Sequence, residues 1–246
     1  MLAKWVSLCR QVVPRMFELE LDMYPNVLAS LPGALRIGNP VLSARELNLA
    51  YRRVDLALLP LDQSSLSDPL LRPLRRLDHR ALWCLSVLGS LSRARPDDGL
   101  ASGQHQSYFK SIEPYIPALA ARLETYDASA YAAKLSEFVW LHTGILVLVE
   151  LKLDRWREAF TQATFNSRLG DGSCVVISES ARPSVDAAVF REAGLGLFSA
   201  TEDGVEQVVF PVLFRRALDP HPFYNKLRAI ADVCSPSPRK WQLLTQ

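Results

Sequence analysis

Two opposite charges at the end of an apolar run have the types and spacing that chemistry requires. The apolar residues 145–149 lead directly into Glu150, and Lys152 follows two positions later. A strand's period of two places both side chains on one face of a sheet. Because a buried carboxylate needs a partner charge or a metal ion, the pair indicates a candidate catalytic or metal-binding site. The alternative is an ordinary ion pair at an exposed strand end, which contributes little to stability.

The segments after this strand predict the scaffold that would hold the pair. Asp154 is expected to cap a helix over residues 155–168, which a glycine-rich turn at 170–172 ends. Strands are then expected at 174–178, 195–200 and 204–210, with a helix at 184–193. This order predicts an α/β (α+β) fold in the C-terminal half, with a mixed central sheet flanked by helices.

The segment before the apolar run allows two interpretations. Residues 136–142 are rich in strand formers and precede Thr143-Gly144, which favours a β-hairpin. In that register Glu137 lies opposite Glu150 at about 5 Å, and two carboxylates so close require a shared proton or a divalent cation. The competing interpretation is a helix from residue 129 through 141, because the same apolar residues fit a 3.6-residue period. Of the two we favour the hairpin.

The N-terminal half is predicted to be mainly helical. A helix is expected at 2–13, and a second from a capping box at Ser43 and Glu46 towards Val54. The alternating apolar and acidic residues at 17–23 predict a half-exposed strand between them.

A third N-terminal helix is expected to start after Ser67-Asp68-Pro69 and to run to about Arg93, and it carries a cluster of arginines. Their spacing places them on one helix face, where they would follow the phosphates of a nucleic acid. A solvated face paired with Asp68 and Asp78 is the alternative. The nucleic-acid-binding candidates are Arg72, Arg75, Arg76 and Arg80.

Residues 95–103 combine Pro, Gly, Ser and Asp and are the expected domain boundary. We therefore expect a mainly helical N-terminal domain at 1–100 that makes nucleic-acid or partner contacts. The second domain, at 101–234, begins with a helix at 108–126, and residues 235–246 form a flexible basic tail.

Composition excludes several classes of function. Lys and Arg total 28 against 26 Asp and Glu in 246 residues, so the net charge of +2 gives no general attraction to nucleic acid or membrane. The four cysteines and four histidines never occur at zinc or redox spacing, and nucleotide-binding and serine-hydrolase motifs are missing. No apolar run approaches the roughly 20 residues that span a bilayer, and the first residues lack a signal-peptide core. A soluble, cytoplasmic protein with no membrane partner is the expectation.

The motif Glu150-x-Lys152 after a buried strand, followed by a capped helix with Gln162 and then strand, helix and strand, resembles the PD-(D/E)XK nuclease superfamily. This superfamily has the restriction-endonuclease-like fold, and the resemblance covers roughly residues 112–210. It implies that Glu150 binds a metal ion, that Lys152 orients or activates the attacking water, and that Gln162 faces the site. A metal ion polarises the phosphate and lowers the pKa of bound water, while an ammonium group stabilises the charge that develops.

The sequence departs from the family's pattern at two positions. The first family motif is an Asp, often after Pro, one to two dozen residues before the Glu, and no Pro-Asp occurs there. Glu137 is the nearest acid, with Asp127 and Glu124 before it. A Tyr often lies four residues after the Gln, and here that residue is Asn166.

These inferences predict a metal-dependent nuclease-fold protein that acts on DNA, in a restriction, defence or recombination system. Mg²⁺ or Mn²⁺ would be held by Glu137 and Glu150, with Lys152 and Gln162 beside it. The alternative is a catalytically inactive subunit that binds nucleic acid or scaffolds a larger protein complex. A protein partner or a second copy of the chain is compatible with either prediction.

Overall fold

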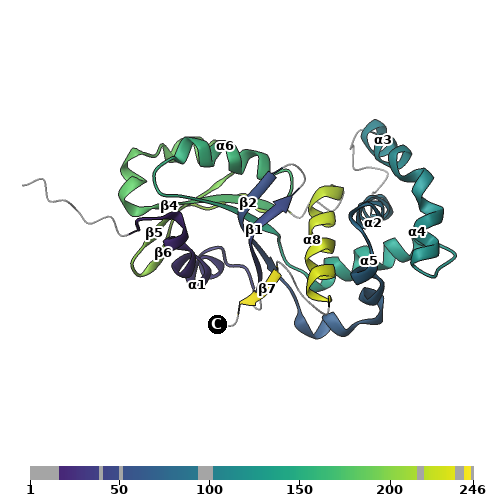
Figure 1. Ribbon diagram of the computed structural model, residues 1–246. Coiled ribbons are helices and arrows are strands. Elements are labelled where there is room, and N and C mark those ends of the chain that lie inside the picture. Colours follow the sequence, from purple (N-terminus) through teal and green to yellow (C-terminus); the bar gives the residue numbers. More distant parts are fainter. Residues whose placement is uncertain are drawn as a thin grey trace, which may run out of the picture.

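A computed structural model describes residues 17–38, 41–49, 52–93, 102–214, 219–235 and 241–244 (Figure 1). Its centre is a seven-stranded sheet with the order β6-β5-β4-β3-β2-β1-β7. The strands are β1 (Val41–Leu49), β2 (Arg52–Pro60), β3 (Val147–Lys152), β4 (Gly172–Ser178), β5 (Gly196–Thr201), β6 (Gly204–Val209) and β7 (Trp241–Leu244).

Helices connect and cover these strands. The α-helices are α1 (Tyr24–Ala34), α2 (His79–Ser92), α3 (Ser102–Ile112), α4 (Ile116–Arg122), α5 (Ala128–His142), α6 (Trp156–Asn166), α7 (Ala187–Glu192) and α8 (Pro220–Val233). The 3₁₀ helices are η1 (Glu20–Met23), η2 (Gln63–Ser67), η3 (Pro69–Arg76), η4 (Glu113–Tyr115) and η5 (Glu179–Ser184). Aspartates whose side chains accept backbone N–H groups begin α2, α5, α7 and α8, which satisfies donors left free at a helix start.

The sheet is mixed. Strands β3, β4 and β5 run parallel and are joined through α6 and α7, whereas β1, β2 and β3 form an antiparallel series. Strand β6 pairs antiparallel with β5, and β7 pairs antiparallel with β1. The predicted mixed sheet flanked by helices is therefore confirmed.

The two faces of the sheet pack against different helices (Figure 1). Val147, Val149 and Leu151 of β3 pack in a core with residues of α1. On the opposite face, Val175 and Ile177 of β4 pack in a core with residues of α6 and α7. Glu150 and Lys152 alternate with the first set along β3, so they lie on the α6 face.

A helical bundle lies beside the sheet and is made mainly of the chain between β2 and β3. Helices α2, α5 and α8 share a core with inward residues of β1 and β2. Their contact is close at Gly89 of α2, where a Cβ would lie 2.5 Å from the Phe223 ring and 3.1 Å from the Ala132 carbonyl oxygen. Figure 1 shows the bundle at the right of the view, with α3 and α4 on its outer side.

The helix and strands predicted after residue 152 are confirmed, but the hairpin and the Asp154 cap are wrong: Arg155 is the N-cap residue of α6, and no side chain caps this helix. Helix α6 lies within the predicted 155–168, and strands β4, β5 and β6 fall at the predicted positions. The hairpin at 136–152 is wrong, because α5 extends to His142. Asp127 begins α5 by accepting the N–H groups of Ser129 and Ala130, and the buried residues Leu135, Phe138 and Val139 follow a helical period.

Two predictions in the first half of the chain are wrong. The predicted helix beginning at Ser43 is instead the strand pair β1 and β2, whose apolar side chains are buried by the bundle. The predicted strand at 17–23 contains η1, because the Asp22 carboxylate accepts the N–H of Leu19 at 2.8 Å and turns the chain. The exposed residues Leu19 and Leu21 supplied the apolar positions of that misleading alternation.

The predicted helices at 70–93 and 108–126 are each interrupted. The first divides into η3 and α2, because Leu77 has extended backbone angles and Asp78 begins α2. The second divides into α3, η4 and α4, at the positions of Pro114 and Pro117, which lack the N–H that a continuous helix needs.

The expected boundary at residue 100 divides a single sheet, since β1 and β2 pair with each other and β2 pairs with β3. Residues 94–101, which include most of the predicted linker, lie outside the described residues, as does the predicted helix at 2–13. In the predicted tail, Trp241–Leu244 form β7, and the Trp241 side chain is buried against the bundle.

Candidate functional site

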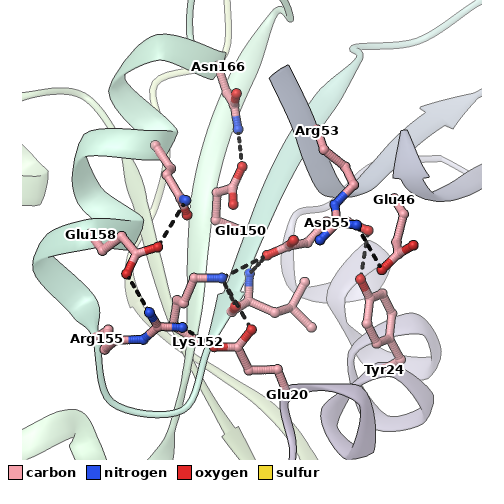
Figure 2. Close-up of polar contacts among 12 residues, drawn as sticks. Glu20, Tyr24, Glu46, Arg53, Asp55, Glu150, Lys152, Arg155, Glu158 and Asn166 are labelled. Carbon is pink, nitrogen blue, oxygen red and sulfur yellow. Dashed lines mark hydrogen bonds and ion pairs between the residues drawn. The ribbon is translucent and has the colours of Figure 1, made fainter. Parts of the chain in front are cut away.

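The carboxylate that faces Glu150 comes from β2. Strand β2 pairs with β3 through Leu56 opposite Val149, Ala57 opposite Leu148 and Leu58 opposite Val147. Asp55 is the next residue of β2 beyond the Leu56 pair, and its negative charge acts on the Glu150 carboxyl. Figure 2 shows Asp55 close to Glu150 and Lys152.

The ammonium group of Lys152 lies among carboxylates from two other segments. Its Nζ lies 3.4 Å from Asp55 Oδ2 and 3.2 Å from Glu20 Oε2, and it donates to the Leu151 carbonyl oxygen at 2.9 Å. The Lys152 side chain is only 7% exposed. Burial alone would lower the pKa of Lys152, but the negative charges of Asp55 and Glu20 outweigh it and raise that pKa above its ordinary value. Lys152 is thus a fixed positive charge at neutral pH.

Two backbone contacts fix Asp55 at the point where β2 and β3 separate. Its Oδ2 atom accepts the N–H of Leu151 at 2.9 Å, beyond the last residue pair of the two strands. The Tyr24 hydroxyl of α1 donates to the Asp55 carbonyl oxygen at 2.8 Å. Helix α1 thereby holds the backbone of β2 beside the charged residues of β3.

Glu150 is a buried carboxyl group, with 1% of the residue exposed. Burial, followed by the charge of Asp55, raises the pKa of Glu150 from 4.5 to about 7, although the hydrogen bond from Asn166 and the charges of Arg52 and Lys152 oppose this rise. Asn166 at the end of α6 donates from Nδ2 to Glu150 Oε1 at 2.6 Å. Glu150 is therefore near the midpoint of its titration at neutral pH.

Helix α6 extends the polar network along its edge. Arg155, just before α6, contacts Glu158 at 2.9 Å and Glu20 at 3.8 Å, and Gln162 Nε2 donates to Glu158 Oε1 at 3.3 Å. Gln162 Oε1 and Asn166 Oδ1 are buried acceptors with no hydrogen-bond partner in the described part of the chain. Buried acceptors are normally satisfied, so these two oxygens mark a place where a donor such as an ordered water belongs.

Glu137 does not complete this cluster. It is exposed on α5, a helix that packs against α2 in the bundle, whereas Glu150 is buried on β3. The prediction that Glu137 faces Glu150 is wrong because it required a hairpin, and the helix α5 does not place residue 137 opposite residue 150. Among the described residues, no three His, Cys, Asp or Glu side chains form a group that would hold a metal ion by themselves.

The predicted arginine face is divided between two elements. Arg72, Arg75 and Arg76 are exposed on η3, and Arg80 is on α2, where its guanidinium lies 4.1 Å from the Tyr115 ring centroid. Element η3 follows Pro60, at the end of β2 away from Asp55. The four arginines therefore do not share one helix face, and in the sequence they are far from Glu150.

Sequence reasoning identified Glu150, Lys152 and Gln162 but missed Asp55, Glu20 and the role of Asn166. Asp55 had a usable signal, because it interrupts the apolar run of β2 in the way that Glu150 interrupts that of β3. Glu20 had none, because its exposed neighbours suggested an outer strand.

Comparisons of the chain with protein-family models, with curated proteins and with solved structures found no match. Within the described residues, no helix has both the length and the apolar character needed to cross a membrane.

Proposed function

We propose that this chain is a metal-dependent nuclease-fold protein that cleaves DNA, of the PD-(D/E)XK kind. The observation that carries the proposal is that Asp55, just beyond the last residue pair of β2 and β3, acts with its charge on Glu150 and lies 3.4 Å from the Lys152 ammonium. Asp55 supplies the first acid that the resemblance requires, from a position 95 residues before Glu150 rather than one to two dozen. The bundle between β2 and β3 accounts for the added separation.

The residues present fit a magnesium or manganese ion. Asp55 and Glu150 would hold the ion, and the Leu151 carbonyl oxygen, which accepts from Lys152 Nζ, would be a further oxygen ligand of the kind that Mg²⁺ takes. Mg²⁺ keeps several waters, and bound waters donate hydrogen bonds. The unsatisfied oxygens of Gln162 and Asn166 are acceptors for such donors. When bound, the ion would polarise a phosphate and lower the pKa of a bound water.

The protein's own groups divide the remaining work. Lys152 stays protonated because its pKa is raised, so its part is to stabilise the negative charge that develops on the phosphate rather than to remove a proton. Burial and the charge of Asp55 raise the pKa of Glu150 without a metal ion, whereas a bound cation would favour its ionised form, so the part of Glu150 is to hold the ion. Asn166 and Glu20 orient these two groups through hydrogen bonds.

A second candidate function is a catalytically inactive subunit that binds nucleic acid. It is favoured by the contacts of Lys152 Nζ, which already occupies Asp55 Oδ2 and the Leu151 carbonyl oxygen. A lysine bound in this way can neutralise the acids permanently and make the site purely structural. A role in a restriction, defence or recombination system belongs only to the first proposed function, the DNA-cleaving protein.

Cleavage of supercoiled plasmid in Mg²⁺ or Mn²⁺ separates the two functions. Wild type should nick the plasmid. Lys152→Ala should lose activity by roughly 10²- to 10³-fold, as is usual when one stabilising donor is removed. Glu137→Gln should match wild type because that carboxyl is exposed on α5. Undiminished nicking by Lys152→Ala would remove Lys152 from the site. Tight DNA binding without cleavage by wild type would establish the second function.

A further inference from the structure

An exposed aromatic ring lies on α6, one residue before the Asn166 that binds Glu150. Phe165 precedes Asn166 near the end of α6. Asn166 is fully buried, whereas Phe165 is 55% exposed. Single exposed apolar side chains are common, so exposure alone indicates nothing. A role for Phe165 is indicated by its contact with Arg52, the first residue of β2.

Arg52 lies near the Phe165 ring and acts with its charge on Glu150. Its guanidinium carbon is 5.9 Å from the centroid of the Phe165 ring, and its positive charge acts on the Glu150 carboxyl. The Arg52 Nε atom is buried and has no hydrogen-bond partner within the described ranges. Arg52 as a whole is only half-buried, so the acceptor oxygens of a ligand would meet its guanidinium from the exposed side rather than at the buried Nε. Phosphate oxygens match the planar donor set of arginine.

We propose that Phe165 and Arg52 form a binding site for one nucleotide of single-stranded DNA, with its base stacked on the exposed ring and its phosphate on the guanidinium. This inference rests on the proposed function, because it names the substrate class of the same site. A phosphate on Arg52 would lie beside Glu150, where the next phosphodiester can reach Asp55 and Lys152.

The chemistry favours a single strand over a duplex. Both faces of a base inside a duplex are covered by its neighbours, so only an unpaired base or a frayed end can stack on a protein ring. Every base has a π face, and such stacking contributes about 1–3 kcal/mol per base without strong sequence preference. Arg52 adds one phosphate contact, which makes binding dependent on salt.

Fluorescence anisotropy tests the site without cleavage. A fluorescein-labelled thymidine oligonucleotide and a blunt hairpin duplex are titrated in EDTA with wild type, Phe165→Ala, Phe165→Trp and Tyr126→Ala. Stacking of about 1–3 kcal/mol predicts about 5- to 150-fold weaker single-strand binding by Phe165→Ala, and unchanged duplex binding. Phe165→Trp should bind as wild type, since it keeps a π face. Tyr126→Ala is the matched control, because Tyr126 is a fully exposed aromatic outside this cluster.

An oligonucleotide with the same backbone but abasic sugars isolates the stacking contact. Wild type should lose affinity for it by the same factor as Phe165→Ala loses for the normal strand, and Phe165→Ala should lose nothing further. Arg52→Gln should reduce the slope of log affinity against log salt by about 0.7, the value for one phosphate of a single strand.

The outcomes distinguish this inference from the proposed function. Equal single-strand binding by wild type and Phe165→Ala overturns the inference, even if the plasmid is cleaved. Loss of single-strand binding by Phe165→Ala supports it, even if wild type cleaves nothing. Equal losses on single strand and duplex overturn the single-strand preference, and tighter binding of the matching RNA overturns the assignment to DNA.

Discussion

Replacing Glu150 with Gln should stabilise the protein at alkaline pH, although it removes a site residue. The Glu150 pKa rises from 4.5 in the ordinary state to about 7 in the fold. The folded chain therefore holds a proton that the unfolded chain releases, and stability falls as pH rises from about 4.5 to about 7. This difference in pKa corresponds to about 3 kcal/mol. Gln carries no charge and can still accept the hydrogen bond from Asn166.

Urea unfolding at pH 4.5 and pH 8 measures the effect. Glu150→Gln and wild type should differ little at pH 4.5, and the variant should be more stable by about 3 kcal/mol at pH 8. Glu137→Gln, at an exposed carboxyl of α5, should follow wild type at both pH values. Two results would refute the explanation that burial and the charge of Asp55 raise the pKa of Glu150. One is equal stability of wild type and Glu150→Gln at pH 8, and the other is a lower stability of the variant at both pH values.

Other perturbations test the surroundings of the site. Asn166→Leu removes the hydrogen bond that lowers the Glu150 pKa, so the acid limb of the cleavage-rate profile should move to higher pH. Lys226→Met removes the ammonium group that lies 2.6 Å from the buried carboxylate of Asp171. Urea unfolding should show that the free energy of unfolding falls by about 3–5 kcal/mol. Arg72→Ala with Arg76→Ala should lower the salt slope of DNA binding if η3 contacts phosphates; an unchanged slope excludes that contact.

The C-terminal part of the sheet was predictable because its signals are local. Strands β3, β4 and β5 are continuous apolar runs that are buried on both faces, and the Asp186 cap and the glycine turns mark the segments between them. The sequence alone placed Glu150 and Lys152 on one face, and the structure agrees.

The other half of the site was not predictable in this way because it depends on contacts between distant segments. Strand β2 is separated from β3 by the whole bundle, and its pairing is decided by burial on both sides rather than by its own pattern. A short-range hairpin was the only partner that periodicity could offer Glu150. Once Leu56 of β2 is known to pair with Val149 of β3, Asp55 and Glu150 are the next residues of the two strands beyond that pair.

The central claim is that Asp55 and Glu150 together hold a divalent cation beside Lys152 and cleave DNA. The most direct measurement is the initial rate of Mn²⁺-dependent plasmid nicking by Asp55→Asn and by Glu137→Gln, each against wild type. We expect at least about a 10²-fold loss for Asp55→Asn, in the range usual for a group that stabilises the transition state, and no change for Glu137→Gln. Nicking that survives in Asp55→Asn, or that is lost in Glu137→Gln, would contradict that claim.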